Sequence, residues 1–526
     1  MRMIRSIALC AATLALASLT VVGPGCGGST NKSTSGDGGG GGSDGGPDVA
    51  SHADSGGDTG GDDGGACDLP AGSVSPQGTQ LVASTTVTIN GVTSDDYAFY
   101  SDTMAGTSSV VPLAGGSPTM IGANDGSGQF TGGPVAFAFN GAGQTGVGSV
   151  TIWTAAHGAQ AISTAAIAPQ GVGQGVVDVS SDGTHVVFMD NAAGSTTDIT
   201  VVNTDGTGKT VLASGLDITS QTCFPLAFFA GAYVIIETCA AGSDGGNSST
   251  LTSYTGTGWT TKATLSTTAL ANAGVAVDST GQTILYPSAT GLQVTTLATG
   301  ASVAIDATGA AGVYTSDGQH VVYVTSGGAI NLASVTGGTP TPLLTAAGYA
   351  GVAGLSPDNS WLLTYKTATQ DMSGDTLSDL YLASATAAGS PTTIASSPTA
   401  SLFGDPFTTD SSRVIYSADI QNGAGTLTAL STAAGSTPAT LAMNDWINLS
   451  AAGAKVVYNA NYTQVCGGPG GTADLSSVDT SKTSPATVLV SQADTPFFLS
   501  KAKDKVVYSW SYLTNSSAGI WVVPLP

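Results

Sequence analysis

The sequence predicts an all-β protein, a β-propeller built from about ten four-stranded repeats of about 45 residues each. Three observations support this. A short turn-and-strand pattern recurs along residues 67–526. No stretch of that region keeps a helical period over three turns. The composition also suits turns and strands, because 74 of the 526 residues are glycine and only 9% are charged.

The recurring pattern is a turn containing Asp or Gly, a small or polar residue, and then β-formers that end in an aromatic residue. Its clearest copies are residues 181–188 (SDGTHVVF) and 316–323 (SDGQHVVY). Looser copies include residues 95–100, 223–239, 280–286, 356–363, 410–416, 453–458 and 504–508, and the weakest lies at 134–154. We expect the repeated aromatic residues to pack between blades.

Two hairpin segments carry a family resemblance. Residues 198–206 (DITVVNTDG) and 209–214 (KTVLAS) predict two strands joined at Asp205-Gly206. Together with the preceding SDG turn, this layout resembles the TolB-type propeller repeat, and residues 355–358 with 379–382 are similar to it. The resemblance implies the fold and is nearly silent on function.

The two ends of residues 67–526 predict how the ring closes. Residues 520–525 correspond to a third strand with no fourth after it, whereas residues 80–84 (QLVAS) correspond to a fourth strand placed before the first repeat. Pairing them would remove a free sheet edge. Since propellers usually have four to eight blades, we expect one ring of about eight or more blades, with some repeats as insertions. Two smaller rings are the alternative.

The first 26 residues are typical of a secretory signal. Arg2 and Arg5 precede an uncharged apolar run, which ends near Cys26. A small residue before this cysteine resembles the bacterial lipoprotein lipobox, although Gly23 stands where that motif prefers Leu. We predict lipidation of Cys26; ordinary signal cleavage, leaving a spare thiol, is the alternative.

Residues 27–66 are almost entirely Gly, Ser, Asp, Thr and Ala, with seven aspartates against one lysine. This composition predicts a disordered tether whose mean reach is about 35 Å. We therefore expect an exported protein that is lipid-anchored at the outer membrane or cell surface, with the periplasm as the alternative. Membrane contact would be through the anchor only.

Four cysteines remain in residues 67–526, and they allow three pairings. Residues 223–239 predict a hairpin turning at Gly231, and reflection about that residue places Cys223 opposite Cys239 at a distance that a disulfide accepts. The remaining pair would be Cys67 and Cys466. Free buried thiols are the alternative.

The charge inventory argues against several kinds of chemistry. With 12 Lys+Arg against 35 Asp+Glu, the chain cannot neutralise a run of phosphates, so we expect no nucleic-acid partner. His185 and His320 share one repeat position, which indicates a structural place rather than a catalytic base. The lone glutamate, Glu237, is predicted to face outward or lie at an edge.

We predict no catalytic residues, no metal site and no cofactor. The loop with Asp371, Asp375 and Asp379 has oxygen ligands for Ca²⁺, but its spacing does not match an EF-hand, so solvated aspartates are the favoured interpretation. We expect a monomeric, non-enzymatic binding or scaffold module of the cell envelope, which takes a protein, peptide or glycan at one propeller face. A hydrolase or lyase with a channel site and a structural or adhesive envelope protein are the alternatives.

Overall fold

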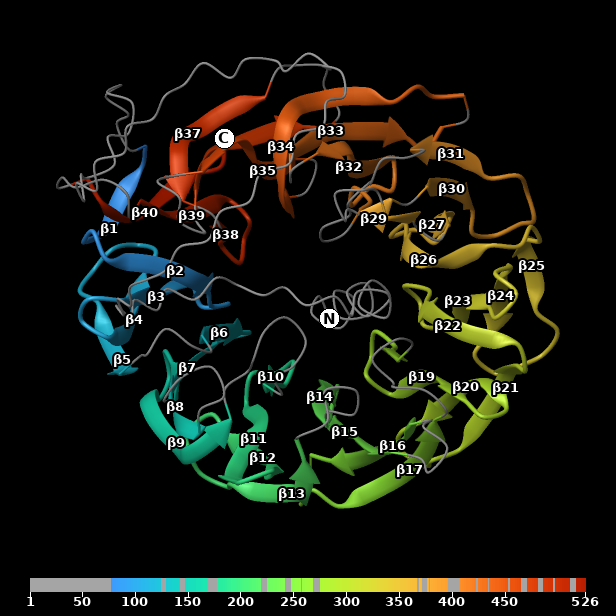
Figure 1. The fold of residues 1–526 in the computed structure, drawn as a ribbon, viewed down its shortest axis with the longest axis horizontal. Helices are drawn as coiled ribbons and strands as arrows, with labels where there is room; N and C mark the ends of the chain where they lie inside the picture. Colours follow the sequence, from blue (N-terminus) through green and yellow to red (C-terminus); the bar gives the residue numbers. More distant parts are fainter. Residues whose placement is uncertain are drawn as a thin grey trace, which may run out of the picture.

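The protein is an all-β propeller with ten blades in a single ring (Figure 1). The computed structural model describes residues 77–526 except 124–128, 142–146, 168–176, 219–224, 242–246, 257, 268–274, 367–368, 371–375, 378, 396–405, 422–423, 434, 453–454, 465–470, 481–485, 495–496 and 511–516. Each blade is an antiparallel sheet. Its strands are called A to D here, from the ring axis to the perimeter.

The strands of blades 1 to 5 follow one another along the chain. Blade 1 contains β2 (Val87–Val92), β3 (Tyr97–Asp102), β4 (Thr107–Pro112) and β5 (Thr119–Ala123). Blade 2 contains β6 (Gln129–Gly132), β7 (Val135–Gly141), β8 (Val147–Thr154) and β9 (Gly158–Ile167). Blade 3 contains β10 (Val177–Val179), β11 (His185–Ala193), β12 (Thr196–Asn203) and β13 (Thr210–Asp217). Blade 4 contains β14 (Leu226–Ala230), β15 (Tyr233–Ala241), β16 (Asn247–Thr255) and β17 (Thr261–Thr267). Blade 5 contains β18 (Ala276–Val277), β19 (Thr283–Ser288), β20 (Gly291–Thr296) and β21 (Ser302–Asp306).

Blades 6 and 7 keep this plan, with one insertion. Blade 6 contains β22 (Gly309–Tyr314), β23 (His320–Thr325), β24 (Ile330–Ser334) and β25 (Thr341–Leu344). Blade 7 contains β26 (Tyr349–Leu355), β27 (Trp361–Lys366), β30 (Leu380–Ser384) and β31 (Thr392–Ala395). A small hairpin, β28 (Thr369–Gln370) with β29 (Thr376–Leu377), is inserted between β27 and β30.

Blades 8 and 9 share one long strand. β32 (Arg413–Gln421) and β33 (Ala424–Ser431) belong to blade 8, whose innermost position is a bridge between Phe407 and Val414. β34 (Ala439–Ala452) pairs with β33 through its first half and with β35 (Lys455–Gln464) through its second half. β36 (Gly471–Asp479) and β37 (Thr487–Asp494) complete blade 9. The two blades therefore form one six-stranded sheet.

The ring closes in blade 10 through both ends of the chain, as the sequence predicts. β38 (Phe498–Leu499), β39 (Lys505–Trp510) and β40 (Gly519–Pro524) come from the C-terminal end, and β1 (Thr79–Ala83) pairs with β40 as the outermost strand. A Cβ on Gly519 would lie 1.8 Å from the carbonyl oxygen of Val82, so this close approach requires glycine. The ten repeats are thus ten blades, which confirms the predicted single ring of about eight or more blades. The expectation that some of the repeats are insertions is wrong.

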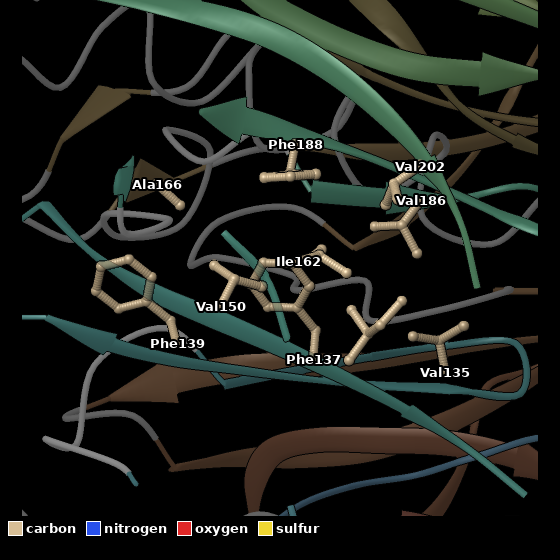
Figure 2. Packing of buried hydrophobic residues seen from close by; sticks show 10 residues of the cluster. Val135, Phe137, Phe139, Val150, Ile162, Ala166, Val186, Phe188 and Val202 are labelled. Carbon is tan, nitrogen blue, oxygen red and sulfur yellow. The ribbon is translucent and has the colours of Figure 1, made fainter. Parts of the chain in front are cut away.

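Ten hydrophobic clusters hold the ring together, one between each pair of neighbouring blades. Figure 2 shows the one between blades 2 and 3, where Phe137 and Phe139 of β7 lie on the side facing Val186 and Phe188 of β11. The repeated aromatic residues occupy such clusters and are at most 5% exposed, which confirms their predicted role: Tyr100, Tyr286, Tyr323, Tyr416, Tyr458 and Tyr508.

The perimeter is built from ten D strands, and each of them pairs with its C strand through at least one register shift. A regular exposed edge is a template for pairing with another chain, and bulges disrupt that template. The irregular D strands therefore limit edge-to-edge association of a ring that has many edges.

Candidate functional site

Because strands alternate in direction, the connections fall on two opposite faces of the ring. The A–B and C–D turns lie on one face, called the AB/CD face, and the B–C and D–A connections lie on the other, the BC/DA face. Six A–B turns share a length of five residues, whereas blades 2 and 4 turn through two residues, at 133–134 and 231–232. The five-residue turns are 180–184, 278–282, 315–319, 356–360, 408–412 and 500–504. The described D–A connections vary, with residues 307–308 joining β21 to β22 and residues 345–348 joining β25 to β26.

A buried hydroxyl organises most of the described A–B turns. In blade 7 the Ser356 hydroxyl donates to the Asp358 carboxylate over 2.6 Å and accepts the Trp361 N–H over 2.9 Å. Ser356 is 1% exposed, so this oxygen has no access to water as an alternative partner. The same hydroxyl position, accepting the N–H five residues later, is occupied in other blades by Ser180, Thr315, Thr408 and Ser500.

These hydrogen bonds hold the turn carboxylates in their charged form. The Ser356 hydroxyl is the main cause that lowers the pKa of Asp358 to about 2, and the Thr408 hydroxyl does the same for the pKa of Asp410. The Thr315 hydroxyl likewise lowers the pKa of Asp317. A carboxylate that accepts several local hydrogen bonds is stabilised as an anion. Such groups are poor proton donors at neutral pH, and we interpret them as structural.

Blade 5 achieves the same turn with the two residue types exchanged. Asp278 stands where the other turns have the hydroxyl, and its Oδ1 accepts the N–H groups of Gln282 and Thr283 over 2.7 and 2.8 Å. Thr280 stands where the others have the aspartate, and its hydroxyl donates to Asp278. The turn needs one hydroxyl and one carboxylate, in either order.

Hydrogen bonds also join neighbouring A–B turns around the ring. Asp358 N–H donates to the Ser411 hydroxyl of blade 8 over 3.0 Å. Lys501 N–H donates to the Asp96 carboxylate of blade 1 over 3.0 Å, across the closure. Further links join Ser94 to Gly133 and Ser316 to Asn359. The AB/CD face therefore carries a belt of connected turns near the axis.

The three described histidines lie on this same face. His185 and His320 end equivalent A–B turns, as the repeat predicts, and His157 lies in the C–D turn of blade 2. The His185 ring contacts Trp259 of blade 4 edge-on, with 5.2 Å between ring centroids. Among the residues that the structure describes, no three His, Cys, Asp or Glu side chains gather as a metal site.

On the BC/DA face, blades 3 and 9 share one carboxylate device. Asp198 accepts the Asn191 side-chain amide over 2.8 Å and the Gly215 N–H over 3.0 Å. Asp474 accepts the Asn461 amide over 2.9 Å and the Gln492 N–H over 3.1 Å. Because Asn191, Asn461, Gly215 and Gln492 all have positive φ, these carboxylates stabilise bulged strand ends.

A lysine lies between two tyrosine rings at the BC/DA end of blade 7. The Lys366 Nζ is 5.1 Å from the Tyr349 ring centroid and 5.3 Å from that of Tyr381, and the two rings meet edge-to-face. Tyr381 Oη donates to Asp379 Oδ2 over 3.2 Å. Asp379 therefore belongs to this cluster, while Asp371 and Asp375 of the predicted carboxylate loop lie outside the described residues. A Ca²⁺ ligand role for that loop stays untested.

Two buried acidic residues were missed from the sequence: the position of Glu237 was predicted wrongly, and Asp190 was not singled out. Glu237 is 2% exposed in β15, opposite Leu226 and Leu251, so the prediction that it faces outward is wrong. Asp190 is fully buried between blades 2 and 3, where Lys209 Nζ lies 2.5 Å away and the Ser163 hydroxyl donates to it. Nothing in the repeat pattern marks Asp190, because its partners come from different strands.

Among the described A strands of blades 1 to 7, which lie nearest the ring axis, Asp178 of β10 is the one charged residue. Its Oδ1 accepts the Val179 N–H over 2.8 Å, and its Oδ2 accepts the Phe229 N–H of β14 over 2.7 Å. Burial raises the pKa of Asp178, against the effect of these hydrogen bonds. A perturbed carboxylate can mark a catalytic site, but here both oxygens are used to join the inner strands of blades 3 and 4.

The predicted modification sites lie mostly outside the described residues. Cys26, Cys67, Cys223 and Cys466 are among them, so lipidation and both disulfides stay predictions. Cys239 lies near the C-terminal end of β15 and pairs with Ser249 of β16. The hairpin turns at Gly231-Ala232 and pairs Leu226 with Glu237, one residue away from the register that reflection about Gly231 gives. The predicted hairpin is confirmed, and its predicted register is wrong.

Comparisons with known proteins show the fold alone. No protein-family model matches the sequence, and a search of curated proteins finds no match. Many solved structures are similar in shape. A eukaryotic initiation factor is 10% identical, with a TM-score of 0.44, over 69% of this chain and 89% of that one. A dipeptidyl peptidase 4 from Porphyromonas gingivalis is 10% identical, with a TM-score of 0.41, over 72% and 65%.

A TolB from Agrobacterium tumefaciens is 16% identical, with a TM-score of 0.27, over 48% of this chain and 90% of that one. In the described part of the chain there is no helix with the length and hydropathy that a membrane span requires.

Proposed function

We propose that the protein is an exported, lipid-anchored propeller that binds a partner through the BC/DA face and has a scaffold rather than a catalytic role. The observation that supports this most is the unequal variation of the two faces. The A–B turns of six blades repeat one hydroxyl-and-carboxylate design, whereas the B–C and D–A connections differ in length and include the β28–β29 insertion. In repeat proteins, variable insertions collect on the face that binds.

The charge of the BC/DA face indicates the kind of partner. Among the described residues, Lys366 is the one basic residue on this face. Seven described carboxylates lie at strand ends on the same side: Asp102, Asp198, Asp217, Asp306, Asp379, Asp474 and Asp494. Such a face repels polyanions. A protein, peptide or glycan that is neutral or cationic fits it.

Photo-crosslinking tests the choice of face. A photoreactive amino acid at Met104, which is 83% exposed in the B–C turn of blade 1, is expected to give partner adducts in intact cells. The matched control is Ala114, which is exposed in the C–D turn of the same blade. Equal adducts from both positions, or adducts from Ala114 alone, would contradict the assignment.

The lipid anchor has its own test. Cys26→Ser is expected to move the protein from the membrane fraction to the soluble fraction, with the wild-type chain as the control. If the substituted chain stays in the membrane fraction, the anchor proposal fails, while the assignment of the binding face is unaffected.

A further inference from the structure

The point where the N-terminal segment joins the ring lies on the AB/CD face. β1 starts at Thr79, opposite Val522 near the end of β40, where the third strand of blade 10 reaches that face. Tyr508 Oη donates to the Gln77 carbonyl over 2.8 Å, which holds Gln77 against blade 10. A lipid attached at Cys26 would therefore pull on this side of the ring.

The basic residues of the ring are concentrated around that point. Five of them occupy the AB/CD ends of blades 8, 9 and 10, and we call them the basic sector: Arg413, Lys455, Lys501, Lys503 and Lys505. Lys501 is exposed and the other four are half-buried. Long basic side chains of this kind lay their stems on the protein and extend the charged group to solvent.

Within blades 8 to 10 the described side chains of this face carry a net positive charge, and the sector ends at the closure, where Asp96 of blade 1 accepts the Lys501 N–H. Its described acids on the same face are Asp410, Asp479 and Asp504, so five basic groups stand against three. Asp410 also accepts hydrogen bonds from Thr408 and Ser412, and Asp504 accepts one from Ser500. Elsewhere on this face acids outnumber bases, with seven aspartates against Lys209 and Lys262: Asp95, Asp96, Asp182, Asp205, Asp278, Asp317 and Asp358.

We propose that the basic sector docks on an anionic lipid surface, which orients the ring with the AB/CD face toward the membrane and the BC/DA face away from it. This inference rests on the proposed lipid anchor. Anionic headgroups attract basic groups only within a Debye length of about 8–10 Å. The acidic remainder of the ring is repelled, so the anchored chain has one favoured orientation. That orientation presents the variable connections to partners.

Vesicle binding by the full chain carrying Cys26→Ser tests the sector without the lipid. We expect co-sedimentation with phosphatidylcholine vesicles that contain phosphatidylglycerol, little with phosphatidylcholine alone, and loss of binding at high salt. The triple change Lys501→Gln, Lys503→Gln and Lys505→Gln should weaken binding about tenfold to hundredfold. The matched triple change of the same lysines to Arg should keep it, since it keeps the charge.

A single charge removed elsewhere on the same face is the second control. Lys262→Gln, at the exposed start of β17 in blade 4, should bind like the parent chain. Equal binding to both kinds of vesicle overturns the proposal, and so does unchanged binding after the triple Gln change. Binding to a soluble polyanion without binding to vesicles also overturns it. Because the lipid is absent throughout, failure here leaves the Cys26 anchor to be decided by its own fractionation test.

Discussion

The two faces of the ring are built on different principles. On the AB/CD face, one turn design repeats and neighbouring turns bond to one another, as Asp358 N–H does to Ser411. On the BC/DA face, blades 3 and 9 share the carboxylate device of Asp198 and Asp474, while blade 7 has an inserted hairpin and a lysine between tyrosines. One face thus holds the blades in register, and the other is free to differ between blades.

This difference explains how a chain with few charged residues stabilises a ring of ten blades. Each inter-blade contact has its own hydrophobic cluster, so the ring grows by nearest-neighbour packing. The A–B turns add hydrogen bonds between neighbouring blades at one end of several of these contacts. Variation at the opposite end then costs little, because the positions of the strands are already set.

The largest expected difference between the faces concerns two glycines of blade 3. Gly183, in the A–B turn, has φ +71°, and a Cβ there would lie 2.4 Å from Pro134 of blade 2. Gly194, in the B–C turn, has φ +64° and no atom within 4 Å of such a Cβ. Gly194→Ala should lower the free energy of unfolding by about 1 kcal/mol through backbone strain alone. Gly183→Ala should lower it by about 2–4 kcal/mol, because overpacking adds to the strain.

Denaturant unfolding of the two variants measures this directly, and the shared positive φ makes Gly194→Ala the matched control. Equal destabilisation would show that the belt contributes nothing beyond local conformation. A smaller loss for Gly183→Ala than for Gly194→Ala would contradict the comparison of the two faces.

The sequence predicts the repeat and the closure well because both have local signals. Turn chemistry and strand alternation are encoded within residues 181–188 and their copies. The β1–β40 pairing follows from a missing fourth strand after residues 520–525 and a fourth-type strand before the first repeat. The number of blades in the ring has no local signal, since it depends on the small angle between neighbouring sheets. That is why the ten repeats predicted one ring of about eight or more blades without fixing the number at ten.

The buried polar residues were beyond prediction for a related reason. Asp190 is neutralised by Lys209 from the start of another strand and by Ser163 of another blade, so no spacing in the sequence identifies the set. Glu237 has no local signal of burial in the sequence, because the strands that pair with it on both sides are set by the fold. The hairpin register failed by one residue because a two-residue turn replaced the single pivot at Gly231.

A second comparison uses serines that begin turns on opposite faces. Ser356→Ala removes the donor to Asp358 and leaves the Trp361 N–H without the buried Ser356 hydroxyl as its acceptor, so we expect a loss of about 1–3 kcal/mol in unfolding free energy. Ser288→Ala, in a B–C turn, removes a half-buried hydroxyl bonded to the Gly291 carbonyl and should cost about 0.5–1 kcal/mol. Thermal unfolding gives the order of the two, and the reverse order would refute the belt as a stabilising feature.

The smallest expected effect is the dependence of stability on acid pH, where two aspartates should act with opposite sign. The folded pKa of Asp358 is about 2, below the ordinary value near 3.9, so its contribution is full above about pH 4 and is lost as the pH falls toward 2. Asp358→Asn should therefore flatten the acid limb of the stability profile, by about 0.5 kcal/mol or less because this carboxylate is exposed.

Burial raises the pKa of Asp178, so its protonation on acidification favours the folded state. Asp178→Asn should accordingly steepen the loss of stability below neutral pH, relative to its own value at pH 7. Denaturant unfolding from pH 7 to pH 3 would measure how the unfolding free energy of each variant changes with pH. If both variants changed this slope in the same direction, the assignment of Asp358 to a solvated turn and of Asp178 to a contact between inner strands would be contradicted.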